Sequence, residues 1–155
     1  MRLPVIRTFV RDQDRWGSGE FQASRGKRKH KGIDIACPPG AEVLAVTGGE
    51  VTRIGFPYDQ EPPLTGFQDE DDRRRFHLKA ALRYVEVTAP GGRRVRYFYL
   101  DPEVKVGDKV AEGRILGIAQ DLQPIYPGIT DHYHFEVLTP SGVVVNPYEF
   151  LEDLL

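Results

Sequence analysis

The chain has 155 residues, of which 40% are hydrophobic and 28% charged, the balance of a soluble globular protein built around one core. Its net charge of −2 at pH 7 argues against nucleic acid and anionic membranes as partners. No stretch approaches the roughly 18 apolar residues of a membrane span, and residues 1–16 lack the features of a secretory signal peptide. We therefore expect one domain over residues 1–155, without a signal peptide or a membrane-spanning segment.

The first pronounced feature is the basic stretch 25–31, RGKRKHK. Such a run is most often a solvated loop, and the alternative is attraction to a carboxylate-bearing substrate or an anionic polymer. An apolar run with Cys37, the only cysteine, follows it. One thiol cannot form an internal disulfide, and in this setting it is expected to be a small packing residue rather than a nucleophile.

Short β-branched runs separated by glycine and proline fill most of the remaining chain, at 41–49, 50–56, 83–92, 93–100, 114–120 and 132–142. Several alternate apolar and polar residues, as half-buried antiparallel strands do. Glycine pairs within 47–49 and 90–92 predict tight hairpin connections. The chain is therefore predicted to be mostly β, a compact antiparallel sheet or sandwich.

Helix signals are confined to two places. Residues 57–82 begin proline-rich and acidic and are predicted to be an insertion between two strands, ending in a helix over 69–82 whose acidic start suits the helix dipole. Near the C-terminus, Asn146 as cap and Pro147 at the first position predict a second short helix.

Two clusters carry residues suited to metal chemistry. His30 and Asp34 form an H-x3-D pattern, and His132 and His134 form an H-x-H pattern. Imidazole and carboxylate ligands suit zinc without any thiolate. Residues two apart on a strand share a face, so one histidine of the second pair can bind a metal while the other contacts what the metal holds. Both patterns also arise by chance, so spacing alone leaves ordinary packed or surface histidines equally open.

Three blocks, residues 18–51, 104–117 and 132–137, follow one another as in the M23 family of LytM/lysostaphin-type zinc metallopeptidases, which the chain resembles. That family consists of peptidoglycan endopeptidases. The resemblance implies a LytM-type fold and a Zn²⁺ ion bound by His30, Asp34 and His134. The resemblance also implies that His132 is a catalytic histidine. Arg25 matches the arginine before the first ligand, which either binds a substrate carboxylate or holds the loop in place.

One segment departs from the family pattern. Where family enzymes have Tyr-Ala-His-Leu, this chain has Tyr-Phe-Tyr-Leu at 97–100, so that Tyr99 replaces a second catalytic histidine. A phenol donates a hydrogen bond to an oxyanion but, with a pKa near ~10, is a poor base at neutral pH. Residues 98–102 and 122–136 resemble the tyrosine-bearing subgroup that includes leukocyte cell-derived chemotaxin. Because the disulfide cysteines of that animal protein are missing, a bacterial or phage member is expected.

Aromatic residues are candidates for the wall of a peptide groove, although in a small β domain they more often fill the core. Tyr126, just before the H-x-H strand, is the strongest candidate for substrate contact. His77 could in principle replace the missing histidine, but packing on a helix face is the expected role. The full set of aromatic candidates is Trp16, Phe21, Phe56, Tyr58, Tyr97 and Tyr126.

Two functions fit these patterns. The first is a zinc-dependent endopeptidase acting on peptidoglycan cross-links, at the cell wall or periplasm or as part of a phage virion, with His132 and Tyr99 as catalytic residues. The second is a catalytically inactive module that keeps zinc for stability and recognises a cell-wall or protein partner.

Overall fold

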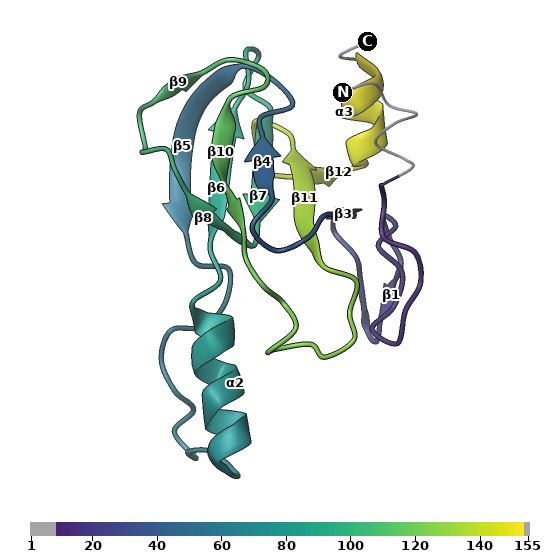
Figure 1. Cartoon of the computed structure of the whole chain (residues 1–155). Helices are drawn as coiled ribbons and strands as arrows, with labels where there is room; N and C mark the ends of the chain where they lie inside the picture. The colour runs from purple at the N-terminus through teal and green to yellow at the C-terminus, as the bar shows by residue number, and fades with distance from the viewer. Residues whose placement is uncertain (1–8, 154–155) are drawn as a thin grey trace.

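The computed structural model describes residues 9–153 and contains two antiparallel β-sheets whose faces enclose a common core (Figure 1). The larger sheet has the order β12-β11-β7-β6-β5-β9, with β3 also paired to β11. Its strands are β3 (Ile33–Ala36), β5 (Gly49–Gly55), β6 (Tyr84–Thr88), β7 (Arg94–Phe98), β9 (Lys109–Val110), β11 (His132–Leu138) and β12 (Val144–Val145). The smaller sheet, β4-β10-β8, contains β4 (Glu42–Leu44), β8 (Leu100–Pro102) and β10 (Ile115–Ala119).

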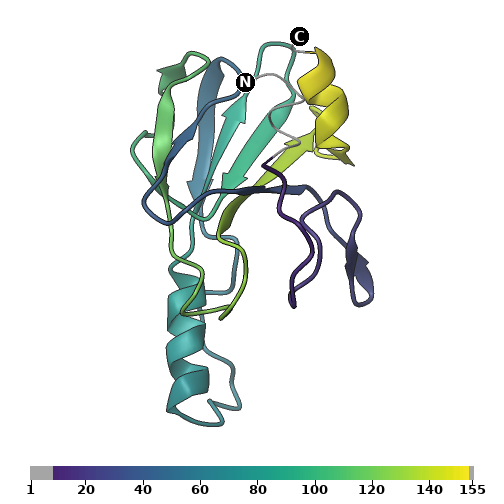
Figure 2. The ribbon, with the colours of Figure 1, turned by 45° about the vertical axis from the view of Figure 1, so that its right-hand side comes forward.

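Three further elements lie outside these sheets. A separate hairpin pairs β1 (Ser24–Arg25) with β2 (Arg28–Lys29). The helices are α2 (Glu70–Ala80) and α3 (Pro147–Asp153). The small sheet lies in front of one face of the large sheet in Figure 1 and to its left in Figure 2. Helix α2 and the β1–β2 hairpin extend from the body on opposite sides of the loop before β11 (Figure 1). The mostly β, antiparallel architecture predicted from the sequence is confirmed.

The alternation along β11 separates the core from the opposite face of the large sheet. Tyr133, Phe135 and Val137 pack into the core with residues of the small sheet such as Leu116. The residues between them project to the other face because successive side chains on a strand point in opposite directions. The two histidines of the H-x-H pattern therefore share that second face, as predicted.

Both predicted helices form. In α2 the Asp69 side chain accepts a hydrogen bond of 2.7 Å from the Asp72 amide, so it caps the first turn. In α3 the Asn146 side chain accepts from the Tyr148 amide at 3.1 Å, with Pro147 at the first helical position. None of the helices found within residues 9–153 is long and apolar enough to cross a membrane.

One of the two predicted hairpins is wrong. Residues 90–92 do connect the neighbouring strands β6 and β7, with Gly91 and Gly92 both at φ 93°. Residues 47–49 instead lead from β4 in the small sheet to β5 in the large sheet. Gly49 is required there by close approach, because a Cβ at this position would lie 2.2 Å from the Thr88 carbonyl oxygen. A glycine pair has the same local signature in a hairpin and in a corner between sheets.

The run 93–100, predicted as one strand, breaks at Tyr99. Strand β7 ends at Phe98 in the large sheet and β8 begins at Leu100 in the small sheet. Tyr99 between them has φ 72°, a left-handed conformation that is uncommon for a bulky residue. Its amide donates to the Arg83 carbonyl at 2.7 Å and its carbonyl accepts from the Gln120 amide at 2.9 Å. These backbone bonds hold the chain in this conformation where it changes sheets.

Cys37 packs against the core and is only partly exposed. Burial raises the pKa of its thiol to about 11. Because the thiolate is the nucleophile, and a free thiol has a pKa of about 8.5, we expect alkylation by iodoacetamide at pH 8 to be slower by roughly 200-fold than for a free cysteine. Mass spectrometry of timed samples measures this rate. The protein unfolded in guanidinium chloride is the control and should react at the ordinary rate, and equal rates would contradict the prediction.

Candidate metal centre

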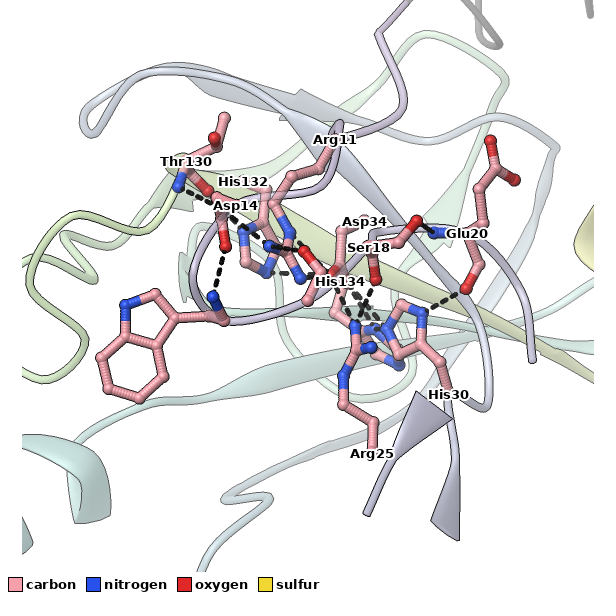
Figure 3. Close-up of polar contacts among 12 residues, drawn as sticks. Arg11, Asp14, Ser18, Glu20, Arg25, His30, Asp34, Thr130, His132 and His134 are labelled. Atoms are coloured by element: carbon pink, nitrogen blue, oxygen red, sulfur yellow. Dashed lines mark hydrogen bonds and ion pairs between the residues drawn. The ribbon is translucent and has the colours of Figure 1, made fainter. Parts of the chain in front are cut away.

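Two segments far apart in the sequence bring His30 and Asp34 together with His134 (Figure 3). His30 directly follows β2, and Asp34 on β3 lies opposite His134 on β11 in the antiparallel ladder. His134 Nδ1 is 2.8 Å from Asp34 Oδ1 and 3.0 Å from His30 Nε2, and His30 Nε2 is 3.0 Å from the same carboxylate oxygen. All three side chains are buried. Their donor atoms lie within 4.8 Å of one another, a group that could hold a metal ion.

The remaining nitrogen of each imidazole has its own partner. His30 Nδ1 lies 2.8 Å from the Glu20 carbonyl oxygen, so this nitrogen donates and Nε2 is free to ligate. His134 Nε2 lies 3.0 Å from Glu136 Oε1, which leaves His134 Nδ1 facing the other two groups. A carbonyl or carboxylate behind a histidine fixes its tautomer and orientation, as it does at protein metal sites. The donor set and its supporting bonds therefore fit a metal ion.

Close backbone packing is needed to place His30. Gly32 lies between the hairpin and β3, and a Cβ at this position would be 2.1 Å from the Phe135 carbonyl oxygen. Only glycine allows the loop to pass this close to β11. The glycine of the His30–Asp34 segment is therefore part of the geometry of the site.

Two arginines surround the Asp34 carboxylate. Arg11 Nε and Nη2 lie 3.2 Å and 3.1 Å from Asp34 Oδ2, and Arg25 Nη2 lies 3.7 Å from the same oxygen. Burial opposes ionisation of Asp34, but hydrogen bonds from His134 and His30 outweigh burial and hold its pKa well below the usual range. Arg11 is itself buried. Sequence reasoning did not identify it, because no motif surrounds it and its partner is 23 residues away.

His132 lies beside this group on the same face of β11. Its Nδ1 is 2.7 Å from the Thr130 carbonyl oxygen, and its Nε2 is 3.5 Å from Asp34 Oδ2. Burial lowers the pKa of His132, and the opposing attraction of Asp34 does not restore it. With Nδ1 donating to the carbonyl, the neutral ring presents an unprotonated Nε2. His132 is therefore equipped to accept a proton.

Tyr99 contacts both strand histidines but forms its hydrogen bond elsewhere. Its ring centroid is 5.7 Å from that of His132 and 6.4 Å from that of His134. Its hydroxyl lies 2.8 Å from the hydroxyl of Tyr58, and the two rings are stacked. Burial raises the pKa of Tyr99 well above 10, and the neighbouring Tyr58 raises it further. The phenol therefore stays protonated and can act as a donor, not as a base.

An open groove of about 730 Å³ contains the site, and all of its residues lie in the described part of the chain. His30, Asp34, His132, His134 and Tyr99 all line it. Of the aromatic candidates, Trp16, Phe56, Tyr58 and Tyr126 line the groove, whereas Tyr97 is fully buried in the core and Phe21 packs against it. The structure thus separates the aromatic residues that line the groove from those that belong to the core, which composition alone could not do.

The profile of Peptidase family M23 matches residues 28–147, which is well over half of the chain. The chain belongs to peptidase family M23. Leukocyte cell-derived chemotaxin-2 of Mus musculus is 31% identical over 127 residues, covering 82% of this chain and 72% of that protein. The bovine chemotaxin is 28% identical over the same length. Within M23, the chain is therefore placed with the chemotaxin-like subgroup.

Solved structures support the M23 fold. The catalytic domain of lysostaphin, an antimicrobial peptidase from Staphylococcus simulans, superposes with a TM-score of 0.62 at 20% identity and covers 97% of each chain. A chain of the SpoIIIAH and SpoIIQ complex superposes with a TM-score of 0.54 at 23% identity, covering 93% of this chain and 80% of that one. These likenesses establish the LytM-type fold and leave the activity to be argued from the site.

Two further residues considered in the sequence analysis, Arg25 of the M23 pattern and His77 of the insertion, have clear positions. Arg25 Nη2 donates to the Ser18 carbonyl at 2.5 Å and Nη1 donates to the Ser24 carbonyl at 3.0 Å, so this arginine does hold the loop and also faces the groove. His77 packs on Phe67 and Phe76 and is not among the groove residues, so it does not replace the missing histidine.

The metal-free M23 site predicts a distinctive pH dependence of stability. Burial lowers the pKa of His134, but bonds to Asp34 and Glu136 more than reverse this and raise it from 6.5 to about 9. The protonated histidine thus stabilises the metal-free fold below pH 6.5, and this stabilisation is lost as the pH rises toward 9. A bound metal takes the place of that proton. We expect the Tm of EDTA-treated protein to fall as the pH rises from 6.5 to 9, and the Tm of zinc-loaded protein to fall less over the same range. Calorimetry measures both values. Equal decreases in Tm would contradict the assignment of His134 as a metal ligand.

Proposed function

We propose that this protein is a zinc-dependent endopeptidase that cleaves peptide cross-links of peptidoglycan. The observation that supports it is that His30, Asp34 and His134 converge at the wall of an open groove. Two imidazoles and one carboxylate are zinc ligands, and three protein ligands leave a fourth position for substrate or water, as in catalytic zinc sites. A closed structural site would instead use four protein ligands.

When bound, zinc supplies Lewis-acid activation of a carbonyl group and of a water molecule. The chain's own residues carry the remaining steps. His132 takes the proton from the attacking water through its free Nε2 and later returns it to the leaving amine. Tyr99 donates its hydroxyl hydrogen bond to the developing oxyanion. Arg11 and Arg25 contact the Asp34 carboxylate and hold it in place.

Tyr58 belongs to the same proposed machinery. Its hydroxyl bond to Tyr99 fixes the direction of the donor, and Lys79 lies 4.4 Å from the Tyr58 ring centroid. Both residues come from the connection between β5 and β6, which includes α2. We treat residues 57–82 as an insertion in a single M23-like domain covering residues 1–155, and Tyr126 as a wall residue that contacts the peptide.

The test is direct exposure to substrate. Zinc-loaded protein is incubated with purified peptidoglycan and with short glycine- and diaminopimelate-containing peptides, and new amino termini are detected by labelling and mass spectrometry. We expect cleavage that EDTA abolishes and zinc restores. A Tyr99→His variant, which restores the usual family residue, is assayed in parallel. If neither protein generates amino termini, the peptidase proposal is wrong.

A second candidate function has its own support. Tyr99 cannot act as a base, because its pKa is raised well above 10, and relatives of the chain include the chemotaxins. The alternative is a catalytically inactive module in which zinc stabilises a groove for a cell-wall or protein partner. The SpoIIIAH and SpoIIQ likeness is to a protein in a complex and supports binding of a protein partner. Cleavage by Tyr99→His alone would favour this alternative. A bacterial or phage source, including a phage virion, is consistent with either function.

A further inference from the structure

The groove differs in charge from the molecule as a whole. The chain carries a net charge of −2. Among the residues of 9–153 that line the groove, the only carboxylates are Asp34 and Glu136, and both are bonded to His134. Cationic side chains outnumber them: Arg11, Arg25, Arg28, Lys29, Lys31 and Arg96. The groove is therefore a positive region on an acidic protein.

These cations fall into two groups. Arg11 and Arg25 are engaged with Asp34, and Arg96 forms a 2.8 Å ion pair with the buried Glu86. Arg28, Lys29 and Lys31 are exposed, and no carboxylate within residues 9–153 pairs with any of them. The second group is therefore available to a ligand. We call Arg28, Lys29 and Lys31 the cationic wall.

The cationic wall begins directly beside the metal centre. Strand β2 consists of Arg28 and Lys29, and His30 is the next residue, followed by Lys31. Aromatic rings, including those of Tyr58 and Tyr126, line the same groove. The hairpin and the α2 connection stand on opposite sides of the loop before β11 (Figures 1 and 2), and each contributes residues to the groove that contains the candidate site.

We propose that the groove is specific for acidic peptides, with carboxylate groups of the ligand lying against the cationic wall immediately beside the metal centre. This inference rests on the proposed peptide-binding function of the same groove. Unpaired cations that face a groove raise the local concentration of anionic ligands and favour carboxylates through charge-assisted hydrogen bonds. The net negative charge of the chain opposes a long polyanion such as nucleic acid, whereas a short peptide contacts only the groove.

Binding to paired synthetic peptides tests the proposal without requiring cleavage. The probes are a short alanine- and glycine-based peptide with glutamate at every second residue and the same peptide with glutamine instead, both fluorescently labelled. Fluorescence anisotropy with zinc-loaded protein gives Kd at low and high salt. We expect the glutamate peptide to bind at least ~5-fold more tightly at low salt, with most of the difference lost in ~0.5 M salt.

The hairpin offers a matched pair of variants. Lys29→Glu reverses a charge in the cationic wall, and Lys27→Glu makes the same change at an exposed turn residue of the same hairpin that does not line the groove. We expect Lys29→Glu to weaken binding of the glutamate peptide by about 3- to 10-fold and to leave the glutamine peptide unaffected, with little effect of Lys27→Glu.

Three results would overturn the proposal. They are equal binding of the two peptides, equal effects of the two variants, and displacement of the glutamate peptide by a single-stranded oligonucleotide at similar concentration, which would indicate nucleic-acid binding. Because binding is read separately from new amino termini, acidic-peptide binding without cleavage would support this inference while rejecting the peptidase.

Discussion

Replacing both His30 and His134 by alanine is expected to remove zinc binding and to lower peptidase activity by at least ~10³-fold, while leaving both sheets folded. The two imidazoles are two of the three candidate ligands, and Asp34 alone cannot retain the ion. The fold should survive because the core residues of β11, Tyr133, Phe135 and Val137, are unchanged. Arg11 still neutralises the Asp34 carboxylate.

Elemental analysis gives zinc per chain, circular dichroism reports the sheets, and the peptide assay reports activity. His77→Ala is the matched control, because it removes an exposed histidine outside the groove and should change none of the three. Unchanged zinc content in the double variant would show that the metal is bound elsewhere. Loss of zinc with full activity would show that catalysis does not use it.

Removing the Tyr99 hydroxyl takes away the proposed oxyanion donor and leaves the metal ligands and His132 unchanged. We expect Tyr99→Phe to lower kcat by about 10²- to 10³-fold with little change in KM, the usual cost of losing one oxyanion donor. Tyr58→Phe keeps that hydroxyl but removes its 2.8 Å partner, so a smaller loss of roughly 10-fold is expected. The double variant should lose little more than Tyr99→Phe, because the two act as one unit.

Steady-state kinetics on a fluorogenic peptide measures these effects, with zinc content and Tm determined for each variant. Tyr84→Phe is the control, since this tyrosine also lines the groove but stacks on Phe98. Additive losses in the double variant would argue that Tyr58 acts independently of Tyr99. An unchanged kcat in Tyr99→Phe would remove Tyr99 from the catalytic machinery.

Local patterns predicted the parts of the molecule that depend on local rules. Strand alternation placed His132 and His134 on one face. An acidic start and good helix formers located α2 to within two residues at each end, and Asn146 and Pro147 located the start of α3. The pairing of Asp34 with His134 followed from the family resemblance and not from spacing. The assignment of metal and catalytic roles to these residues stays a prediction until the experiments above are made.

Features that depend on contacts between distant segments were not predictable. Arg11 has no motif, and its partner Asp34 is 23 residues away. Tyr58 was expected only as a groove candidate, and its hydrogen bond to Tyr99, 41 residues away, was not predicted. Residues 47–49 form a corner between sheets, although a hairpin was predicted there. Strands β4 and β5 pair with different partners because they belong to different sheets, and the packing of the two sheets decides this, not the local sequence. From the sequence, the basic stretch 25–31 could be either a solvated loop or a ligand-binding element. The structure favours the second role because the hairpin borders the groove.

The left-handed backbone at Tyr99 limits what evolution can place at this position. With φ 72°, β-branched side chains are strongly disfavoured, whereas histidine is among the non-glycine residues found more often in this conformation. An exchange between tyrosine and histidine therefore changes the chemistry of the groove without rebuilding the corner that joins the two sheets. A lineage could gain or lose a catalytic base here in one substitution, with the scaffold intact on either side of the change.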